Sequence, residues 1–171
     1  MDSKDFPTAE QLNALIKSLF EECTPGLLEC ARSSGCSPEV AEDLVQDTFA
    51  VALEKPLKLY YAPNRRRWLK RTLKNLIWNH QTKVMYAQKL LSMLAQQRRE
   101  SQTDELNPSV LYRGMIEEKD LRLLFRYWVR QEPVKKIAAD LDIGMEACWK
   151  RLQRAKARFE KAYKEQMGRL D

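Results

Sequence analysis

Side chains that can read DNA bases recur on one face of the stretch 145–159. Arginine and glutamine pair with base edges, and lysine pairs with phosphates. At helical spacing this face collects Trp149, Lys150, Arg151, Gln153, Arg154 and Arg158. The pattern predicts a helix that enters a major groove. The alternative is a solvated basic face in an ordinary all-α domain.

The element that must position this face starts at Val134. The sequence V-K-K-I-A-A-D-L predicts a short helix, and Asp142-Ile143-Gly144 predicts a turn in which Ile143 points inward. Two apolar stripes should pack together. They are Ile137, Ala138 and Leu141 in the first helix, and Met145, Cys148, Leu152, Ala155 and Phe159 in the second. Two helices joined by a short turn predict a helix-turn-helix, and a glycine in the turn would allow the helices to pack closely.

A second basic stretch lies at residues 61–100, which hold ten Lys or Arg against one acid. We expect a helix from Arg65 to about Leu94. Its core side would carry Trp68, Leu69, Thr72, Leu73, Leu76, Ile77 and Val84, and its outer side Lys70, Arg71, Lys74, Asn75 and Trp78. An exposed tryptophan among cations suits stacking on an unpaired base. The alternative is that Trp78 packs under a neighbouring element.

Residues 1–60 are acidic, with five Lys or Arg against eleven Asp or Glu. Ser37-Pro38 predicts a helix start, and the helix should run from Pro38 to about Glu54. One side is apolar, and the opposite side carries Glu42, Asp43, Gln46 and Asp47. Like charges four residues apart repel, so this face favours a basic protein partner. A plain solvated face and a carboxylate metal site remain alternatives.

The rest of the chain also predicts helices, because it is rich in Leu, Ala, Lys, Arg, Glu and Gln and has only five glycines. A capped helix should run from Thr8 to Cys23, followed by a break at Pro25-Gly26 and a short helix to Ser33. Residues 55–64 should form a loop. We therefore expect an all-α fold of two small helical domains, 8–97 and 117–167. A polar, flexible linker, 98–116, would join them.

Several classes of function are disfavoured. The four cysteines form no C-x-x-C pair and the single His80 is distant, so a zinc site is not expected. No histidine or further acid joins the carboxylates at 42–47, so that alternative metal site is weak, and no metal or cofactor is expected. We interpret the cysteines as free thiols, with a redox switch at Cys23, Cys30 and Cys36 as the alternative. We expect no enzyme, because residues 61–99 hold no acid and there is no P-loop or Ser/His/Asp set. Without a signal peptide or a membrane span, a cytoplasmic protein with no membrane insertion is expected.

Three motifs together resemble the bacterial RNA polymerase sigma factors of the sigma-70 family, in the small two-domain extracytoplasmic-function (ECF) group. A-E-D-L-V-Q-D-T-F at 41–49 resembles the core-binding helix of region two. W-L-K-R-T-L-K-N-L at 68–76 resembles the promoter-melting helix. The stretch I-A-A-D-L-D-I-G-M-E-A-C-W-K-R-L-Q-R-A at 137–155 resembles the region-four helix-turn-helix. The resemblance implies promoter-specific transcription initiation, with 8–97 as region two and 117–167 as region four.

The resemblance also implies roles for the residues. Glu42, Asp43, Gln46 and Asp47 would bind the clamp helices of the largest subunit of core RNA polymerase. The minus-ten element would be contacted by Tyr60, Tyr61, Asn64, Lys70, Arg71, Lys74, Asn75, Trp78 and Asn79. The minus-thirty-five element would be contacted by Trp149, Lys150, Arg151, Gln153, Arg154 and Arg158. Further partners would be the polymerase flap, promoter DNA and an anti-sigma protein.

The chain departs from the family pattern at two places. Asn79-His80 stands where the family usually has Asp-Arg, and Ala147-Cys148-Trp149 stands where it usually has Thr-Val-Lys. We therefore expect an unusual promoter sequence. The alternative function is a helix-turn-helix transcription regulator that does not bind core polymerase, for which the acidic helix at 38–54 would have no use.

Overall fold

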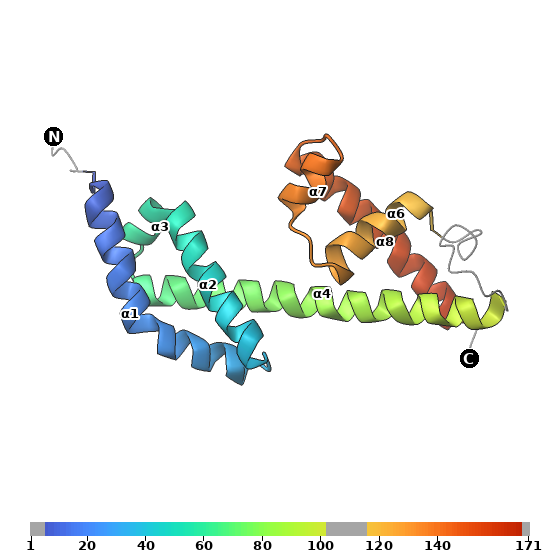
Figure 1. Cartoon of the computed structure of the whole chain (residues 1–171), viewed down its shortest axis with the longest axis horizontal. Coiled ribbons are helices and arrows are strands. Elements are labelled where there is room, and N and C mark those ends of the chain that lie inside the picture. The colour runs from blue at the N-terminus through green and yellow to red at the C-terminus, as the bar shows by residue number, and fades with distance from the viewer. Residues whose placement is uncertain (1–5, 102–115, 169–171) are drawn as a thin grey trace. The chain divides into compact units, whose positions relative to one another are not determined.

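The structure, a computed structural model, describes residues 6–101 and 116–168, and every regular element in these ranges is a helix. The prediction of an all-α fold is confirmed for this part of the chain. Figure 1 shows the helices in chain order. Of the predicted linker 98–116, residues 102–115 lie outside the described residues.

Internal contacts divide the chain into two units, Met1–His80 and Gln81–Asp171. The division falls inside one helix, α4 (Arg65–Ser101). This helix runs past its predicted end near Leu94, because good helix formers continue beyond that residue. The predicted functional boundaries at 97 and 117 stay predictions. The two units are called the N-terminal and C-terminal unit below.

The N-terminal unit opens with α1 (Ala9–Ser33), whose predicted cap at Thr8 is a capping box with Gln11. Thr8 Oγ1 accepts a hydrogen bond from the Gln11 amide at 3.2 Å, and Gln11 Oε1 accepts one from the Thr8 amide at 2.9 Å. The predicted break at Pro25-Gly26 is wrong. The helix continues through Pro25 and bends (Figure 1). Burial of Leu27 and Ala31 beyond the proline offsets the missing backbone hydrogen bond.

The next turn and helix follow the sequence closely. Gly35 adopts a left-handed backbone with φ of 85°, which glycine accepts without strain. Ser37 then caps α2 (Pro38–Glu54), since its hydroxyl accepts a hydrogen bond from the Val40 amide at 3.4 Å. Residues 55–64 were predicted as a loop, yet they contain a short helix, α3 (Pro56–Tyr60). Proline at its first position and the fully buried Leu59 account for this helix.

The core of the N-terminal unit is one apolar cluster contributed by α1, α2, α3 and the first part of α4. Its buried members from α1 are Ile16, Leu19, Leu27 and Ala31. Those from α2 and α3 are Ala41, Leu44, Val45, Phe49, Ala52 and Leu59, and those from α4 are Leu69, Leu73 and Ile77. The core side of α4 was thus predicted correctly up to Ile77, whereas Val84 is 36% exposed and the prediction that it is buried is wrong.

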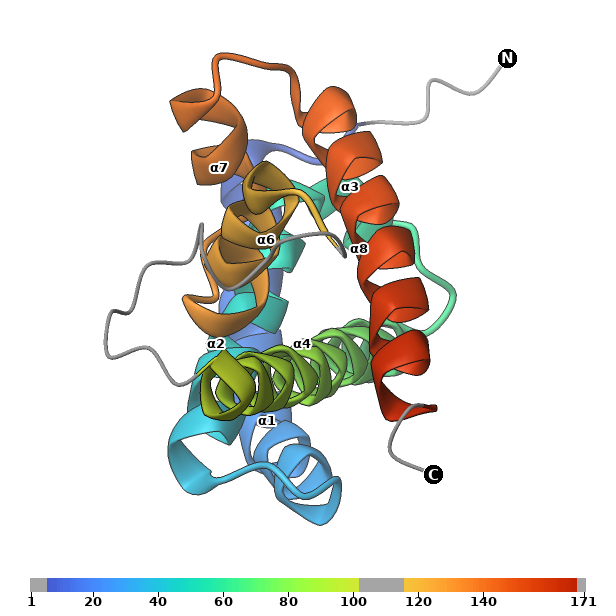
Figure 2. The same ribbon diagram turned by 90° about the vertical axis from the view of Figure 1, so that its right-hand side faces the viewer.

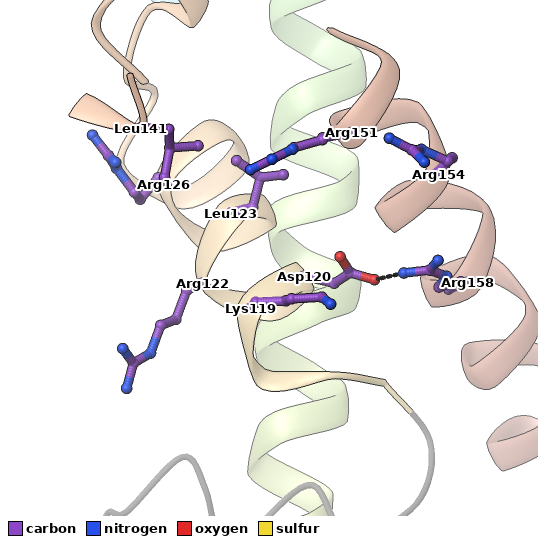
Figure 3. Close-up of a pocket in the computed structure, with 9 residues that line it drawn as sticks. All are labelled: Lys119, Asp120, Arg122, Leu123, Arg126, Leu141, Arg151, Arg154 and Arg158. Atoms are coloured by element: carbon purple, nitrogen blue, oxygen red, sulfur yellow. Dashed lines mark hydrogen bonds and ion pairs between the residues drawn. The ribbon is translucent and has the colours of Figure 1, made fainter. Parts of the chain in front are cut away.

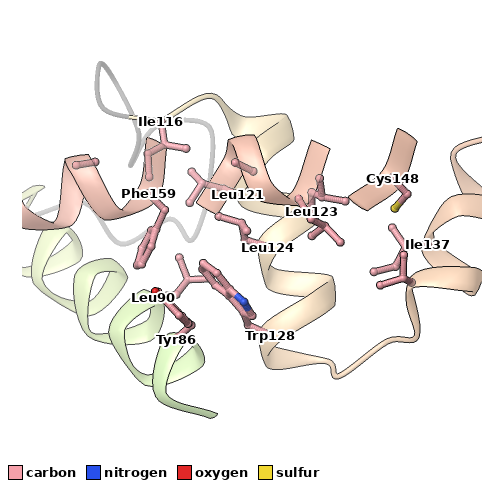
Figure 4. Close-up of a cluster of buried hydrophobic side chains, with 14 of the residues drawn as sticks. Tyr86, Leu90, Ile116, Leu121, Leu123, Leu124, Trp128, Ile137, Cys148 and Phe159 are labelled. Carbon is pink, nitrogen blue, oxygen red and sulfur yellow. The ribbon is translucent and has the colours of Figure 1, made fainter. Parts of the chain in front are cut away.

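The C-terminal unit combines residues 81–101 of α4 with α6 (Glu118–Leu124), the π-helical turn η1 (Phe125–Val129), α7 (Val134–Asp140) and α8 (Met145–Met167). In Figure 4, Tyr86 and Leu90 of α4 face Trp128 and Phe159 across the core. The Tyr86 and Trp128 rings stack with centroids 4.7 Å apart. Residues 81–101 therefore supply one wall of the core that holds α7 and α8.

Candidate nucleic-acid interface

The helix-turn-helix in the C-terminal unit consists of α7, a short turn and α8, as Figure 2 shows. Ile137 and Ala138 of α7 are buried, as are Cys148 and Leu152 of α8. The amide of Ile143 donates to the carbonyl of Ala138 at 3.0 Å and closes the turn. These predicted inward positions are confirmed, and they fix which side of α8 faces outward.

Two details of the predicted turn are wrong. Leu141 and Met145, predicted to point inward, are 39% and 50% exposed, because the turn carries them past the edge of the core. Close packing does not require Gly144, since a Cβ added there would meet no atom within 4 Å. The left-handed residue of the turn is Asp142, with φ of 51°, a conformation that aspartate tolerates better than most residues.

All six predicted α8 contact residues, Trp149, Lys150, Arg151, Gln153, Arg154 and Arg158, are exposed. They differ in whether their side chains already form ion pairs within the chain. Lys150 pairs with Glu146 at 2.8 Å, and Arg158 pairs with the buried Asp120 of α6. Arg151 and Arg154 form no ion pair with any described residue, so their charges are the ones available to an anion.

Trp149 is anchored rather than free. Its ring meets the edge of Tyr127 with centroids 5.7 Å apart, and its residue is 39% exposed. Together with Glu146, Lys150, Gln153 and Arg154, it lines an open, shallow groove on α8. A fixed aromatic beside glutamine and cations can contact a base edge or a thymine methyl group.

The N-terminal unit carries the second candidate surface. The side of α4 formed by Lys70, Arg71, Lys74, Asn75, Trp78 and Asn79 is exposed throughout. Trp78 is 67% exposed, so the alternative that it packs beneath a neighbour is wrong within the described residues. A planar ring on a cationic strip can stack on an unpaired base.

The tyrosine segment before α4 has a partly structural role. Tyr60 is half-buried, and its carbonyl accepts a hydrogen bond from Arg65 Nη2 at 3.0 Å. Asn64 Oδ1 accepts one from the Arg67 amide at 2.9 Å, so this side chain caps α4. Tyr61 is 51% exposed and available. At 1.5 Å per residue, this segment and Trp78 lie about 20 Å apart along α4, so the predicted minus-ten residues form a strip rather than a pocket.

The acidic surface lies on α2. Glu42, Asp43, Gln46 and Asp47 are all exposed, whereas Ala41, Leu44, Val45 and Thr48 on the other side of the same helix are buried. Neither Glu42 nor Asp43 forms an ion pair with a described residue. The predicted two-faced helix is therefore confirmed, and its outer face can meet a basic surface.

Sequence reasoning missed a third charged feature, a cavity of about 560 Å³ in the C-terminal unit. Figure 3 shows Arg151, Arg154 and Arg158 reaching into it from α8. α6 contributes Lys119, Asp120, Arg122 and Leu123 to the lining, η1 contributes Arg126, and Leu141 lies at one end. In Figure 3 the side chain of Arg122 points away from α8. Residues 101–133 have a net charge near zero, so they form no basic block along the sequence. The three- and four-residue spacing of Lys119, Arg122 and Arg126 is the sequence pattern that indicates a shared cationic face.

The cysteines pack as small apolar groups. All four are free thiols; Cys148 is buried, and Cys23, Cys30 and Cys36 lie against the N-terminal core. Burial raises the pKa of the Cys23, Cys36 and Cys148 thiols, which disfavours reactive thiolates. In the described ranges, no three His, Cys, Asp or Glu side chains gather closely enough to hold a metal ion. None of the described helices has the length and apolar character to cross a membrane.

No protein-family model matches this chain, and no curated protein matches it.

Proposed function

We propose that this chain is an alternative sigma factor that binds core RNA polymerase and directs it to specific promoters. The observation that carries the proposal is the exposed acidic face of α2, defined by Glu42, Asp43, Gln46 and Asp47. Such a face would repel DNA phosphates and is suited to a second, basic partner. A chain with two cationic surfaces and one acidic surface fits a protein that joins DNA to another macromolecule.

The two cationic surfaces suit two kinds of DNA. The open strip on α4, with Trp78 projecting among Lys74, Arg71 and Lys70, suits a single strand whose bases stack on an aromatic ring. The α8 face, with Gln153, Arg154 and the anchored Trp149, suits base edges in a duplex. A melted minus-ten element and a duplex minus-thirty-five element are such a pair. We also propose that an anti-sigma protein binds the chain and covers these faces.

Each DNA surface alone is small, and contacts made by a few cations weaken steeply with salt. Polymerase bound to α2 would present both surfaces to one promoter and convert two weak contacts into one stronger one. Promoter selectivity should therefore belong to the complex with polymerase rather than to the free chain.

The test is a pull-down of bacterial core RNA polymerase with the wild-type chain and with Asp43→Arg/Asp47→Arg. Charge reversal on the acidic face should reduce capture at least about ten-fold, since close charge pairs across interfaces couple by over 1.5 kcal/mol. Glu21→Arg/Glu29→Arg makes the same charge change at exposed residues of α1, away from the acidic face of α2, and should retain capture.

Two outcomes would contradict the proposal. Equal loss in both variants would mean that capture follows net charge rather than the α2 face. A wild-type chain that binds duplex DNA but not core polymerase would instead be a helix-turn-helix regulator.

A further inference from the structure

We propose that the cavity between α6 and α8 binds a small molecule that carries two or more phosphates on an apolar or aromatic body, the chemistry of a nucleoside polyphosphate. The cavity has a volume of about 560 Å³, within the range of small-molecule sites. Six cations and one carboxylate line it. All the lining residues belong to the C-terminal unit.

The cations fall into two groups. Arg126 is fixed by Glu132, with which its Nη2 pairs at 2.6 Å, and by Asp140, while Arg158 is fixed by Asp120. The hydrogen bond to Glu132 and the charges around it hold the pKa of Arg126 above its usual value. These ion pairs stabilise the walls of the cavity and contribute little free positive charge.

The second group is only weakly engaged, and Arg154 Nε donates a hydrogen bond to the Lys150 carbonyl at 3.2 Å. Arg151 and Arg154 have no ion-pair partner among the described residues and both reach into the cavity (Figure 3). Lys119 pairs with Glu117 and Arg122 pairs with Glu118, but the cation of each pair is highly exposed, and such surface pairs contribute little to stability. These four cations can turn to an anion at small cost. Arginine binds phosphate oxygens through two parallel N–H donors, so a polyphosphate fits better than a single carboxylate.

The apolar part of the cavity favours a ligand with a body beyond its phosphates. Leu123 and Leu141 line it together with the aliphatic stems of the arginines. Leu141 is 39% exposed, an unusual position for a leucine that the sequence pattern placed in the core. A guanidinium plane can also stack on a nucleobase. Inorganic phosphate alone would leave most of this volume and the leucines unused.

Arg154 connects the cavity to the candidate duplex surface, because it also lines the groove with Trp149, Lys150 and Gln153 on α8. A polyphosphate that draws Arg151 and Arg154 into the cavity would remove them from DNA. The ligand would therefore act as an inhibitor of duplex binding. This regulatory part rests on the proposed function, whereas binding to the cavity does not.

The test is calorimetric titration of the full chain with ATP, sodium tripolyphosphate and adenosine at fixed ionic strength, without divalent cations. ATP should bind saturably at one site per chain, more tightly than tripolyphosphate or adenosine. Arg151→Gln/Arg154→Gln should weaken ATP binding at least about ten-fold, and Lys119→Gln/Arg122→Gln several-fold, since each removes charge-assisted hydrogen bonds. Lys161→Gln/Lys164→Gln, an equal charge change on α8 outside the cavity, should leave ATP affinity unchanged.

Non-saturable ATP binding, or equal weakening in the Lys161/Lys164 control, would overturn the site. Tripolyphosphate binding as tightly as ATP would overturn the nucleoside part. In a parallel experiment, ATP should displace a labelled 30-bp duplex from the wild-type chain. Duplex binding without ATP binding overturns the cavity proposal alone. ATP binding without duplex binding contradicts the duplex-binding role proposed for α8 and leaves the cavity proposal standing. Binding of both without displacement overturns the inhibition.

Discussion

Replacing Leu90 by alanine should destabilise the helix-turn-helix unit, although Leu90 lies on α4, more than forty residues before α7. Leu90 is 1% exposed within the C-terminal core. The substitution removes three carbon groups at about 0.8 kcal/mol each and leaves a cavity, so the cost should be about 3 kcal/mol. For a unit of this size, that corresponds to a fall in melting temperature of about 12–24 °C.

Leu91 is the matched control, because it is the adjacent leucine on the same helix and is 45% exposed. Leu91→Ala should change stability by less than about 0.5 kcal/mol. Urea unfolding gives the free energies, and hydrogen–deuterium exchange with mass spectrometry locates the change. Leu90→Ala should increase exchange in α6, α7 and α8 and leave α1 and α2 protected. Equal effects of the two substitutions would refute the assignment of residues 81–101 to the C-terminal unit.

Three further predictions concern the charged and aromatic surfaces. Trp78→Ala should weaken binding of a single-stranded oligonucleotide, measured by fluorescence anisotropy, about 5- to 100-fold through lost stacking, without lowering the melting temperature. Arg151→Gln/Arg154→Gln should reduce the slope of log K against log salt for duplex binding by about 2, and an unchanged slope would exclude these contacts. Burial and the hydrogen bond that its hydroxyl donates to Glu160 raise the pKa of Tyr86 to about 12. Native Tyr86 thus keeps its proton after the unfolded chain has lost it, and stability should fall as the pH rises from about 10 to 12. Tyr86→Phe should make that fall shallower in alkaline unfolding curves.

Features that depend on neighbours within one or two helical turns are predictable from the sequence. The capping box at Thr8 and the helix start at Ser37-Pro38 are local hydrogen-bond and backbone effects. The acidic face of α2 and the buried stripe through Cys148 and Leu152 follow from helical periodicity alone. Every residue predicted for the α2 and α8 faces is exposed for the same reason.

Features that depend on contacts between distant segments are set by the packing of the folded chain. α1 continues through Pro25 because the residues after the proline find a core to pack against. Leu141 and Met145 have the helical spacing of core residues, yet the core ends before it reaches them. The cavity cations Arg122 and Arg151 come from segments that look unrelated in sequence, and folding places them on one surface. Periodicity states which side of a helix is apolar, whereas the packing partner, and therefore the limit of the core, is set by the whole fold.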